Sequence, residues 1–502
     1  MTTRHTARPA SSTFSTALAR NRMGTPGVSL SIVSSVAPLT VVAGVVTTGL
    51  AVTGLTGVSV AMVAVAVTLI LFAVGYVAMA RHITNTGAFY AYISLGLFRP
   101  VGVGSAWVAV AAYNCFQIAS YGGLGTIGAP LIEQWFGVAV PWWTIALVAW
   151  IIVAILGVRD VKVSERVLAV LVLAETTLVL VYSFAILLSS EFRPSLAPWS
   201  LESLWGPGAG ALLVIAATGF AGVEQGAVYI EESREPKRTV ARATFLTITL
   251  VAALYAFASW VQISAAGDQA VDRARAEGPD LFFNLASGPL GSFTVDLGRL
   301  LFLTSLLAAL IAFHNIISRY TFSLGREGVW PRPLGEAPGG APRRGSMVQS
   351  ALALVVISVY AIAGWDPLVQ LFFWGGTTGG LGVLLLITAT SIAVIFYFAR
   401  DSHGETVWRR LIAPVIASAL LLIISYLALA NLATLFGVEP GTGPAVIAPL
   451  AYLVTLVAGI LWGLTLRVTR PAVYEGIGLG PRAAAASTTG FSSLMGMDDR
   501  RR

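Results

Sequence analysis

Long apolar runs without charge constrain the fold of this chain more than any other feature. A helix needs about 20 mainly apolar residues to cross a bilayer. Ordinary soluble chains carry roughly a quarter charged residues, whereas only 11% of the 502 residues are charged here. The sequence therefore predicts an all-α polytopic membrane protein with about 12 transmembrane helices. The runs cover residues 28–50, 58–80, 101–125, 142–158, 167–189, 208–230, 241–265, 299–318, 347–364, 368–398, 411–434 and 445–466.

The basic residues between these runs predict the orientation. Cytoplasmic loops of membrane proteins are enriched in Lys and Arg. With alternating sides, 27 of the 31 basic residues fall on the side of the two termini. The other four are Arg193, Arg273, Arg275 and Arg299. We therefore expect a multi-pass protein of the cytoplasmic membrane with both termini in the cytosol. A missed or invented helix would swap the sides of every later loop and destroy this asymmetry.

The rest of the chain excludes several other classes of protein. Residues 1–27 predict a basic cytosolic tail, and residues 467–502, with AAAASTTG and a terminal DDRRR, predict a disordered one. A net charge of +7 without a soluble basic domain does not indicate nucleic-acid binding. The single cysteine, Cys115, excludes an intramolecular disulfide. No nucleotide, metal or nucleophile motif is present, so we expect no enzyme, cofactor or metal centre; the oligomeric state stays open.

Two of the runs are interrupted by helix-breaking residues. The first, SIVSSVAPLTVVAGVVTTG, contains Pro38 and Gly44, and we expect a break near 37–44. The sixth, AATGFAGVEQGAVYIEES, contains three glycines around an acid. Broken helices in matching positions of two halves indicate an inverted-repeat transporter with its site near the bilayer midplane. Exposed amides at such breaks suit a carboxylate and freed carbonyls suit an ammonium, so a zwitterion fits both. The alternative is that both segments are kinks or close-packing points.

Three segments carry a resemblance to a known family. GFAGVEQGAVYIEESREPKR at 219–238 resembles the sixth helix and following loop of the amino acid–polyamine–organocation (APC) superfamily. RYTFSLGREGVWPRPL at 319–334 resembles the loop after its eighth helix. GYVAMARHITNTGAFYAYISLGLF at 75–98 is similar to the region between helices two and three, with Asn85 to Ala88 in place of the usual Pro and double Gly.

The resemblance covers about residues 25–470 and implies a five-plus-five inverted-repeat fold with discontinuous helices one and six. The twelve-helix domain would span 28–466, with repeats at about 28–189 and 208–398 and two extra helices at 411–466. It also implies transport of amino acids, polyamines or related cations.

The resemblance further implies a set of substrate-binding residues. In the first helix Pro38 has no amide to offer, so Leu39 and Thr40 would bind the substrate carboxylate. Phe220 would cover the substrate, and Phe313 falls where the family's arginine/agmatine antiporters have a tryptophan. Asn114 and Gln117 could equally hydrogen-bond neighbouring helices, and the two phenylalanines could be packing residues. The full set is Ala37, Pro38, Leu39, Thr40, Asn114, Gln117, Thr218, Gly219, Phe220, Ala221, Gly222 and Phe313.

Glu175 and Glu224 are the only acids well inside the runs. An anionic carboxylate is costly at that depth, so both could carry a proton. Glu224 matches the glutamate linked to proton coupling in the family's arginine/agmatine antiporters, whereas a structural hydrogen bond is the favoured interpretation of Glu175. The hydroxyls of Thr304 and Ser305 could bind a sodium ion, so sodium coupling is an alternative to proton coupling.

These observations predict a secondary active transporter that works by alternating access. We expect proton-coupled uptake of a neutral amino acid, because no counter-charge other than Glu224 is expected to face the site. A polyamine or amine carrier and an amino acid exchanger are the alternatives within transport. A transport-silent sensor is the alternative from another class; a channel would show a repeated pore-lining pattern.

Overall fold

The computed structural model describes residues 18, 22–159, 161–481 and 483 of the chain. Every regular element in these residues is a helix, and one isolated bridge joins Met23 to Ser233. Within this described part, eleven helices are long and apolar enough to cross a membrane, and one further apolar helix, Trp142–Gly157, has 16 residues. The all-α polytopic fold class is thus confirmed, while the count of twelve and the inverted repeat stay predictions.

The elements follow the expected runs closely. The first half of the chain contains α1 (Thr25–Val36), η1 (Thr40–Val45), α2 (Val46–Thr53), α3 (Val58–Ala80), α4 (Phe89–Gly96), α5 (Arg99–Phe136), α6 (Trp142–Gly157), α7 (Val161–Leu187), η2 (Ala197–Trp199), α8 (Leu201–Leu204), α9 (Ala209–Thr218), η3 (Val223–Tyr229) and α10 (Pro236–Ala266). The second half contains η4 (Gly267–Gln269), α11 (Ala270–Glu277), α12 (Asp280–Leu290), α13 (Phe293–Arg326), η5 (Arg332–Gly335), η6 (Pro338–Gly340), α14 (Arg343–Ala363), η7 (Pro367–Phe373), α15 (Trp374–Arg400), η8 (Trp408–Ile412), α16 (Ala413–Ala430), α17 (Leu432–Phe436), α18 (Pro444–Thr469) and α19 (Pro471–Gly476).

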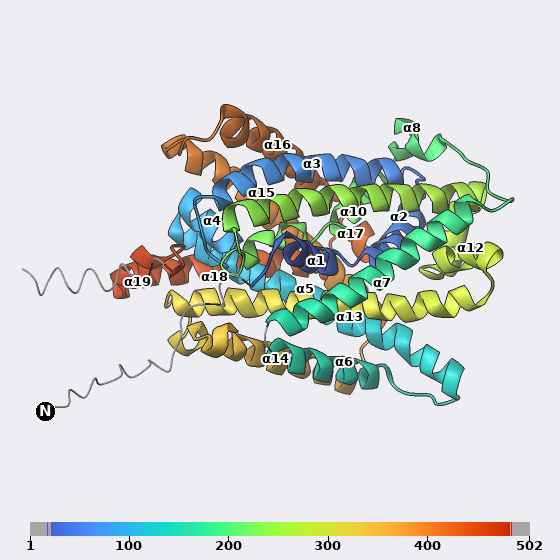
Figure 1. Cartoon of the computed structure of the whole chain (residues 1–502), viewed down its shortest axis with the longest axis horizontal. Helices are drawn as coiled ribbons and strands as arrows, with labels where there is room; N and C mark the ends of the chain where they lie inside the picture. Colours follow the sequence, from blue (N-terminus) through green and yellow to red (C-terminus); the bar gives the residue numbers. More distant parts are fainter. Residues whose placement is uncertain (1–17, 19–21, 160, 482, 484–502) are drawn as a thin grey trace, which may run out of the picture.

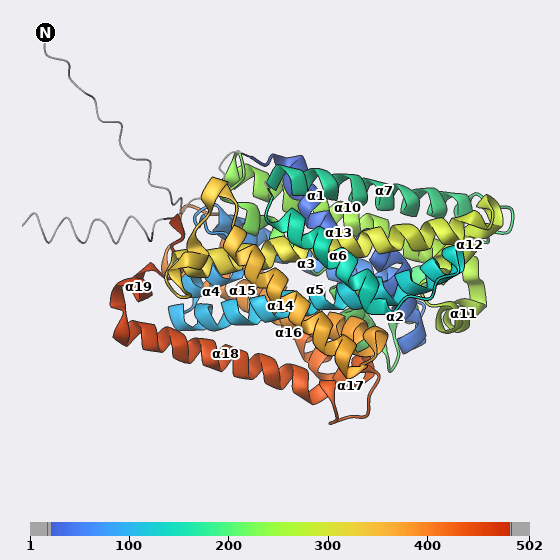
Figure 2. The ribbon, with the colours of Figure 1, turned by 90° about the horizontal axis from the view of Figure 1, so that it is seen from below.

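The long helices lie side by side along the longest axis of the molecule (Figure 1). The last helix, α19, lies at one end, where α3 and α13 also finish; we call this the termini end. The opposite end, which we call the far end, carries α12 and the last turn of α2 (Figures 1 and 2). A substrate path through the protein would have to connect these two ends.

Helix α5 is central to the packing, with α13, α15 and α18 against it. Glycines permit the closest of these approaches. A Cβ on Gly104 would lie 2.6 Å from the carbonyl oxygen of Leu456, and one on Gly459 would lie 2.6 Å from the Cα of Gly104. Small residues are common where membrane helices cross, because they let the helices pack closely. Close packing matters in lipid, since the hydrophobic effect does not drive helices together there.

The prediction of a disordered tail from residue 467 is wrong for the first part of that segment. Helix α18 continues to Thr469, α19 follows, and Ile477 is completely buried. The apolar residues of this short segment pack against the bundle, which composition alone does not reveal. The remainder of the expected tail, residue 482 and residues 484–502, lies outside the described residues.

The expected N-terminal tail also ends earlier than predicted. Helix α1 begins at Thr25, and both Leu18 and Met23 are buried. The backbone N–H groups of Arg22 and Met23 donate to the carbonyl oxygen of Glu232, at 2.9 and 3.1 Å. These bonds attach the chain just before α1 to the segment after η3. Residues 1–17 and 19–21 of the predicted tail lie outside the described part.

Candidate functional site

The first membrane helix is interrupted where the sequence predicts. Helix α1 ends at Val36, and Ala37 has left-handed backbone angles of φ 50° and ψ 73°. This region is sparsely populated for residues with a side chain, and such strain is concentrated at functional sites. The backbone is helical again from Pro38, and the π-helix η1 begins at Thr40. The break therefore leaves the amides of Leu39 and Thr40 outside the hydrogen bonding of α1.

The sixth expected run is interrupted as well. Helix α9 ends at Thr218, the chain turns through 219–222, and the 3₁₀-helix η3 begins at Val223. Gly222 has φ 113°, and a Cβ on it would lie 2.7 Å from the Cβ of Ser35. A hydrogen bond from the Ser35 hydroxyl to Gln225 joins the same two segments. The two breaks therefore meet inside the protein.

Replacement of Gly222 by alanine should disturb this meeting point. An L-residue at this angle costs about 1–3 kcal/mol, and its methyl group would also press on Ser35. We expect Gly222→Ala to lower the thermal unfolding temperature in detergent and to reduce transport. Gly288→Ala is the matched control, because Gly288 has an ordinary φ and nothing within 4 Å of the added carbon. Equal effects of the two variants would contradict the prediction.

Each break is held by a buried glutamate. The carboxylate of Glu224 accepts bonds from the Gly222 amide at 2.9 Å and the Tyr113 hydroxyl at 2.7 Å. The carboxylate of Glu175 accepts a bond from the Leu39 amide at 3.2 Å. Glu224 is 2% exposed and Glu175 is completely buried. The two acids that could carry a proton thus contact the two backbone interruptions.

The amides expected to bind a substrate carboxylate already have partners within the protein. Leu39 donates to Glu175, and the amide of Thr40 donates to the Ser305 hydroxyl at 3.4 Å. The Thr40 hydroxyl also lies 3.0 Å from that of Ser305. A substrate carboxylate would therefore have to exchange with Glu175 and Ser305 at this break.

A cavity of about 560 Å³ lies against both breaks. Its volume is within the range of about 300–1,000 Å³ typical of small-molecule sites. Five of the expected substrate residues line it, and none of the described residues that line it is charged. The cavity extends past Ala51 and Val52 of α2 to Pro279 and Gly437, near the far end. The five expected residues are Ala37, Thr40, Thr218, Ala221 and Phe313.

Aromatic side chains form one wall of this cavity. The rings of Phe116 and Phe313 are stacked with centroids 5.0 Å apart and planes 6° from parallel. Tyr113, one turn before Phe116 on α5, also stacks on Phe313, with centroids 6.2 Å apart. Phe372 and Trp374 line the same space as the two phenylalanines. Of these rings only Phe313 belongs to the expected substrate set. Trp374 in the tenth expected run is a candidate for lining the path or for close packing, and the positions of Phe116 and Phe372 depend on how α5 and the segment before α15 pack.

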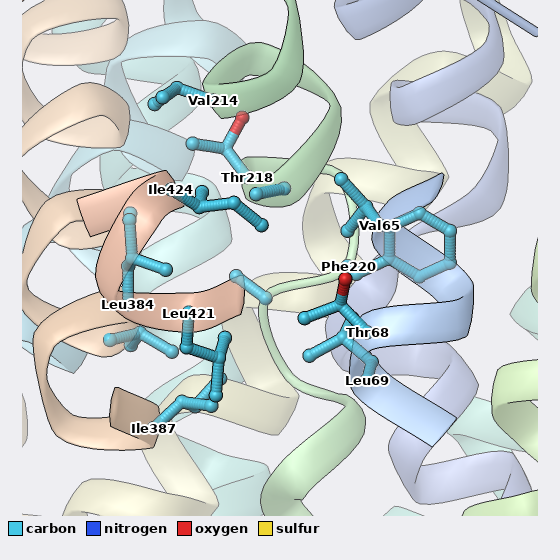
Figure 3. A pocket seen from close by; sticks show the side chains of 14 residues that line it. Val65, Thr68, Leu69, Val214, Thr218, Phe220, Leu384, Ile387, Leu421 and Ile424 are labelled. Atoms are coloured by element: carbon cyan, nitrogen blue, oxygen red, sulfur yellow. The ribbon is translucent and has the colours of Figure 1, made fainter. Parts of the chain in front are cut away.

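Phe220 lies beside a second, much smaller cavity of about 30 Å³. In Figure 3 its ring is next to Val65, across this space from Leu384 and Ile387. The ring also packs edge-on against Tyr255, with centroids 5.4 Å apart. Phe220 does not line the larger cavity, so its expected role as a cover over the substrate stays a prediction. Two further expected residues, Gly219 and Gly222, shape the backbone at the break without lining that cavity either.

Asn114 and Gln117 take part in an interhelical network. The amide group of Gln349 on α14 donates to the side-chain oxygens of Asn114 and Gln117, both at 2.6 Å. Gln117 also lies 3.2 Å from Nδ1 of His314, and the other ring nitrogen of His314 lies 2.8 Å from Ser346. Both residues lie between α5, α13 and α14, and neither is among the residues that line the large cavity. These are interhelical hydrogen bonds of the kind that the sequence left open as an alternative, and substrate contact at these residues stays a prediction.

The termini end is bridged by two buried ion pairs. Glu231 pairs with Arg326 at 2.7 Å, and Glu232 pairs with Arg319 at 2.9 Å. The arginines lie seven residues apart on α13, which therefore continues beyond the expected run that ends at 318. The glutamates directly follow the sixth expected run, which ends at 230 and contains η3, so these pairs connect that run to α13. The cavity thus extends toward the far end, while the ion pairs join these two segments at the termini end.

The profile of the amino acid permease family matches residues 16–460 of the chain. The chain belongs to the amino acid permease family. This family is part of the APC superfamily, as the three sequence segments indicate, and the permease is an amino acid transporter that spans the membrane several times. A comparison with individual curated proteins gives no match.

Proposed function

We propose that the permease takes up a neutral amino acid together with a proton across the cytoplasmic membrane. It does so by alternating access about the two helix breaks. The observation that carries this proposal is the uncharged cavity that touches both breaks and extends to the far end. With both termini in the cytosol, as the basic residues predict, the cavity faces the outside. The substrate would enter there and leave at the termini end after the ion pairs separate.

The cavity favours a zwitterion with a large apolar side chain. The breaks supply backbone amides and carbonyls for the charged groups, and Phe116, Phe313 and Phe372 supply an apolar wall. Aromatic side chains bury large apolar areas and stack on one another, which suits an aromatic or branched substrate. A polyamine would require carboxylates or more polar walls, and no described residue lining the cavity carries a charge.

The glutamates on the breaks support proton coupling. Hydrogen bonds to an ionised carboxylate are roughly twice as strong as those to a neutral group. Protonation of Glu224 would therefore weaken its hold on the Gly222 amide. Protonation of Glu175 would likewise loosen the Leu39 amide and allow a substrate carboxylate to replace it. Substrate and proton would then bind together, which is the requirement for symport.

Ligand-dependent thermal stability tests the substrate class. A ligand that binds only the folded state stabilises it by about 2.7 kcal/mol at 100 times its dissociation constant. We expect phenylalanine and leucine to raise the unfolding temperature of the purified permease, while spermidine and putrescine have no effect. Phe313→Ala should weaken the response to phenylalanine. A shift with the polyamines alone would overturn the proposal, and binding without counterflow in proteoliposomes would indicate a sensor.

A further inference from the structure

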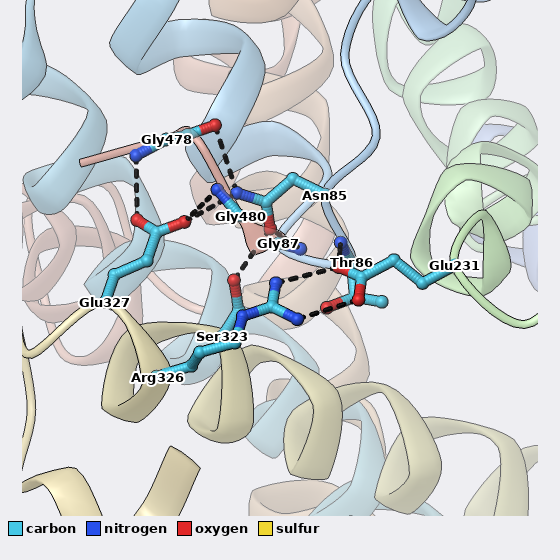
Figure 4. A network of polar contacts seen from close by, with 9 residues as sticks. All are labelled: Asn85, Thr86, Gly87, Glu231, Ser323, Arg326, Glu327, Gly478 and Gly480. Carbon is cyan, nitrogen blue, oxygen red and sulfur yellow. Dashed lines mark hydrogen bonds and ion pairs between the residues drawn. The ribbon is translucent and has the colours of Figure 1, made fainter. Parts of the chain in front are cut away.

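The carboxylate of Glu327, the residue directly after α13, is enclosed by four donors. Figure 4 shows Asn85, Gly478 and Gly480 around it. The backbone amides of Gly478 and Gly480 donate to its two oxygens, each at 2.7 Å. The side chain of Asn85 donates to it at 2.8 Å, and the hydroxyl of Tyr90 completes the set. Glu327 is 5% exposed. Two of its four donors therefore come from the chain beyond the last membrane helix.

Residues 477–480, which we call the C-terminal strap, fit this place closely. Gly478 and Gly480 have φ of 84° and 60°, angles that residues with side chains rarely adopt. A Cβ on Gly480 would lie 2.9 Å from the carbonyl oxygen of Thr84. The carbonyl of Gly478 accepts a bond from Asn85 at 3.1 Å, and Ile477 is completely buried. The strap is thus bound by shape as well as by hydrogen bonds.

The strap is connected to the ion pair that closes the termini end. Asn85 contacts Glu327 and Gly478, and its side-chain oxygen accepts a bond from Ser323 of α13 at 2.7 Å. The amide of the next residue, Thr86, donates to Glu231 at 3.1 Å. Glu231 is the partner of Arg326. Asn85 therefore binds the strap, while its neighbour Thr86 binds Glu231 of the ion pair. Figure 4 shows both contacts together.

The strap lies beyond the residues that the family profile matches. The family match ends at residue 460, and the strap begins 17 residues later. Its contacts lie at the termini end, which must open to release the substrate. In the closed conformation Glu231 and Arg326 are paired; in an open conformation they have separated. Each hydrogen bond to the loop at Asn85 and Thr86 stabilises the closed conformation relative to the open one.

We propose that the C-terminal strap is a built-in brake that holds the termini end of the permease closed by binding Glu327 and the loop at Asn85. Its release shifts the conformational equilibrium toward a state open at that end. The consequence for transport rests on the proposed function; the conformational effect does not.

Two truncations of the full chain test the brake. One ends after Gly476 and lacks the strap, and the control ends after Ala483 and keeps it. Hydrogen–deuterium exchange is measured on the purified proteins in α1 and η3, with central α5 as the internal reference. We expect the shorter chain to exchange about tenfold faster in α1 and η3, equivalent to about 1.4 kcal/mol. The control should exchange like the full chain.

Faster exchange confined to residues 84–90, with α1 and η3 unchanged, would overturn the proposal and leave the strap a local packing element. If the shorter chain does not fold, Gly480→Val in the full chain is used instead, because its side chain would displace the strap. The same change in exchange of α1 and η3 is then expected. Uptake in proteoliposomes is a separate readout. Absent uptake by the full chain would contradict the proposed function, while the exchange experiment would still decide the brake.

Discussion

Glu224→Gln is expected to abolish amino acid uptake driven by a pH gradient while leaving exchange of substrate across the membrane. Glutamine keeps the shape of the side chain and can still accept a bond from the Tyr113 hydroxyl or the Gly222 amide. It cannot take up and release a proton. The measurement compares gradient-driven uptake with counterflow in the same proteoliposomes.

The control for this variant is Glu235→Gln, which removes a carboxylate whose side chain is 66% exposed at the termini end. It should leave both activities unchanged. Glu175→Gln distinguishes the roles of the two buried acids. If Glu175 only accepts the hydrogen bond from the Leu39 amide, the variant should keep uptake driven by the pH gradient. Unchanged gradient-driven uptake by Glu224→Gln would exclude Glu224 as the coupling residue.

Glu232→Ala is expected to cause the largest loss of stability. Arg319 is 1% exposed and donates to both oxygens of Glu232, and its guanidinium lies 4.6 Å from the ring centroid of Tyr229. Removing one partner of a buried ion pair leaves an uncompensated charge and costs about 3–5 kcal/mol. Thermal unfolding of the purified protein in detergent measures this loss.

The double variant Glu232→Ala with Arg319→Met provides the control, because it removes both charges and fills part of the space with an apolar side chain. It should recover most of the stability, as replacement of buried pairs by apolar residues is often neutral. A single variant as stable as the parent protein would show that the pair does not hold the termini end together.

The positions of the helices and of the two breaks could be predicted because their causes are local. A run of apolar residues specifies a membrane helix through its own hydropathy. Pro38 removes a backbone donor wherever the helix lies, and Gly222 permits the φ that the turn requires. Glu224 could likewise be singled out, because acids are rare inside such runs.

The partners of the polar residues could not be predicted in the same way. The side-chain amide of Gln349 binds both Asn114 and Gln117, and the ring of His314 lies within hydrogen-bond distance of Gln117. These partners are more than 190 residues away along the chain. The ordered strap depends on Glu327, which no feature of the tail sequence reveals. Hydrogen-bond geometry between distant segments is set by how the helices pack.

The sequence by itself determined that this protein is a helical membrane protein with two broken helices and two acids inside its apolar runs, since hydropathy and backbone preferences act between neighbouring residues. The resemblance of three segments to a known family added the expectation of transport. Only the tertiary structure decided which residues line the cavity and which glutamate holds which amide. It also decided that the chain after α18 binds back onto the bundle. These contacts join segments far apart in sequence, and their free energy depends on the packed arrangement of all the helices.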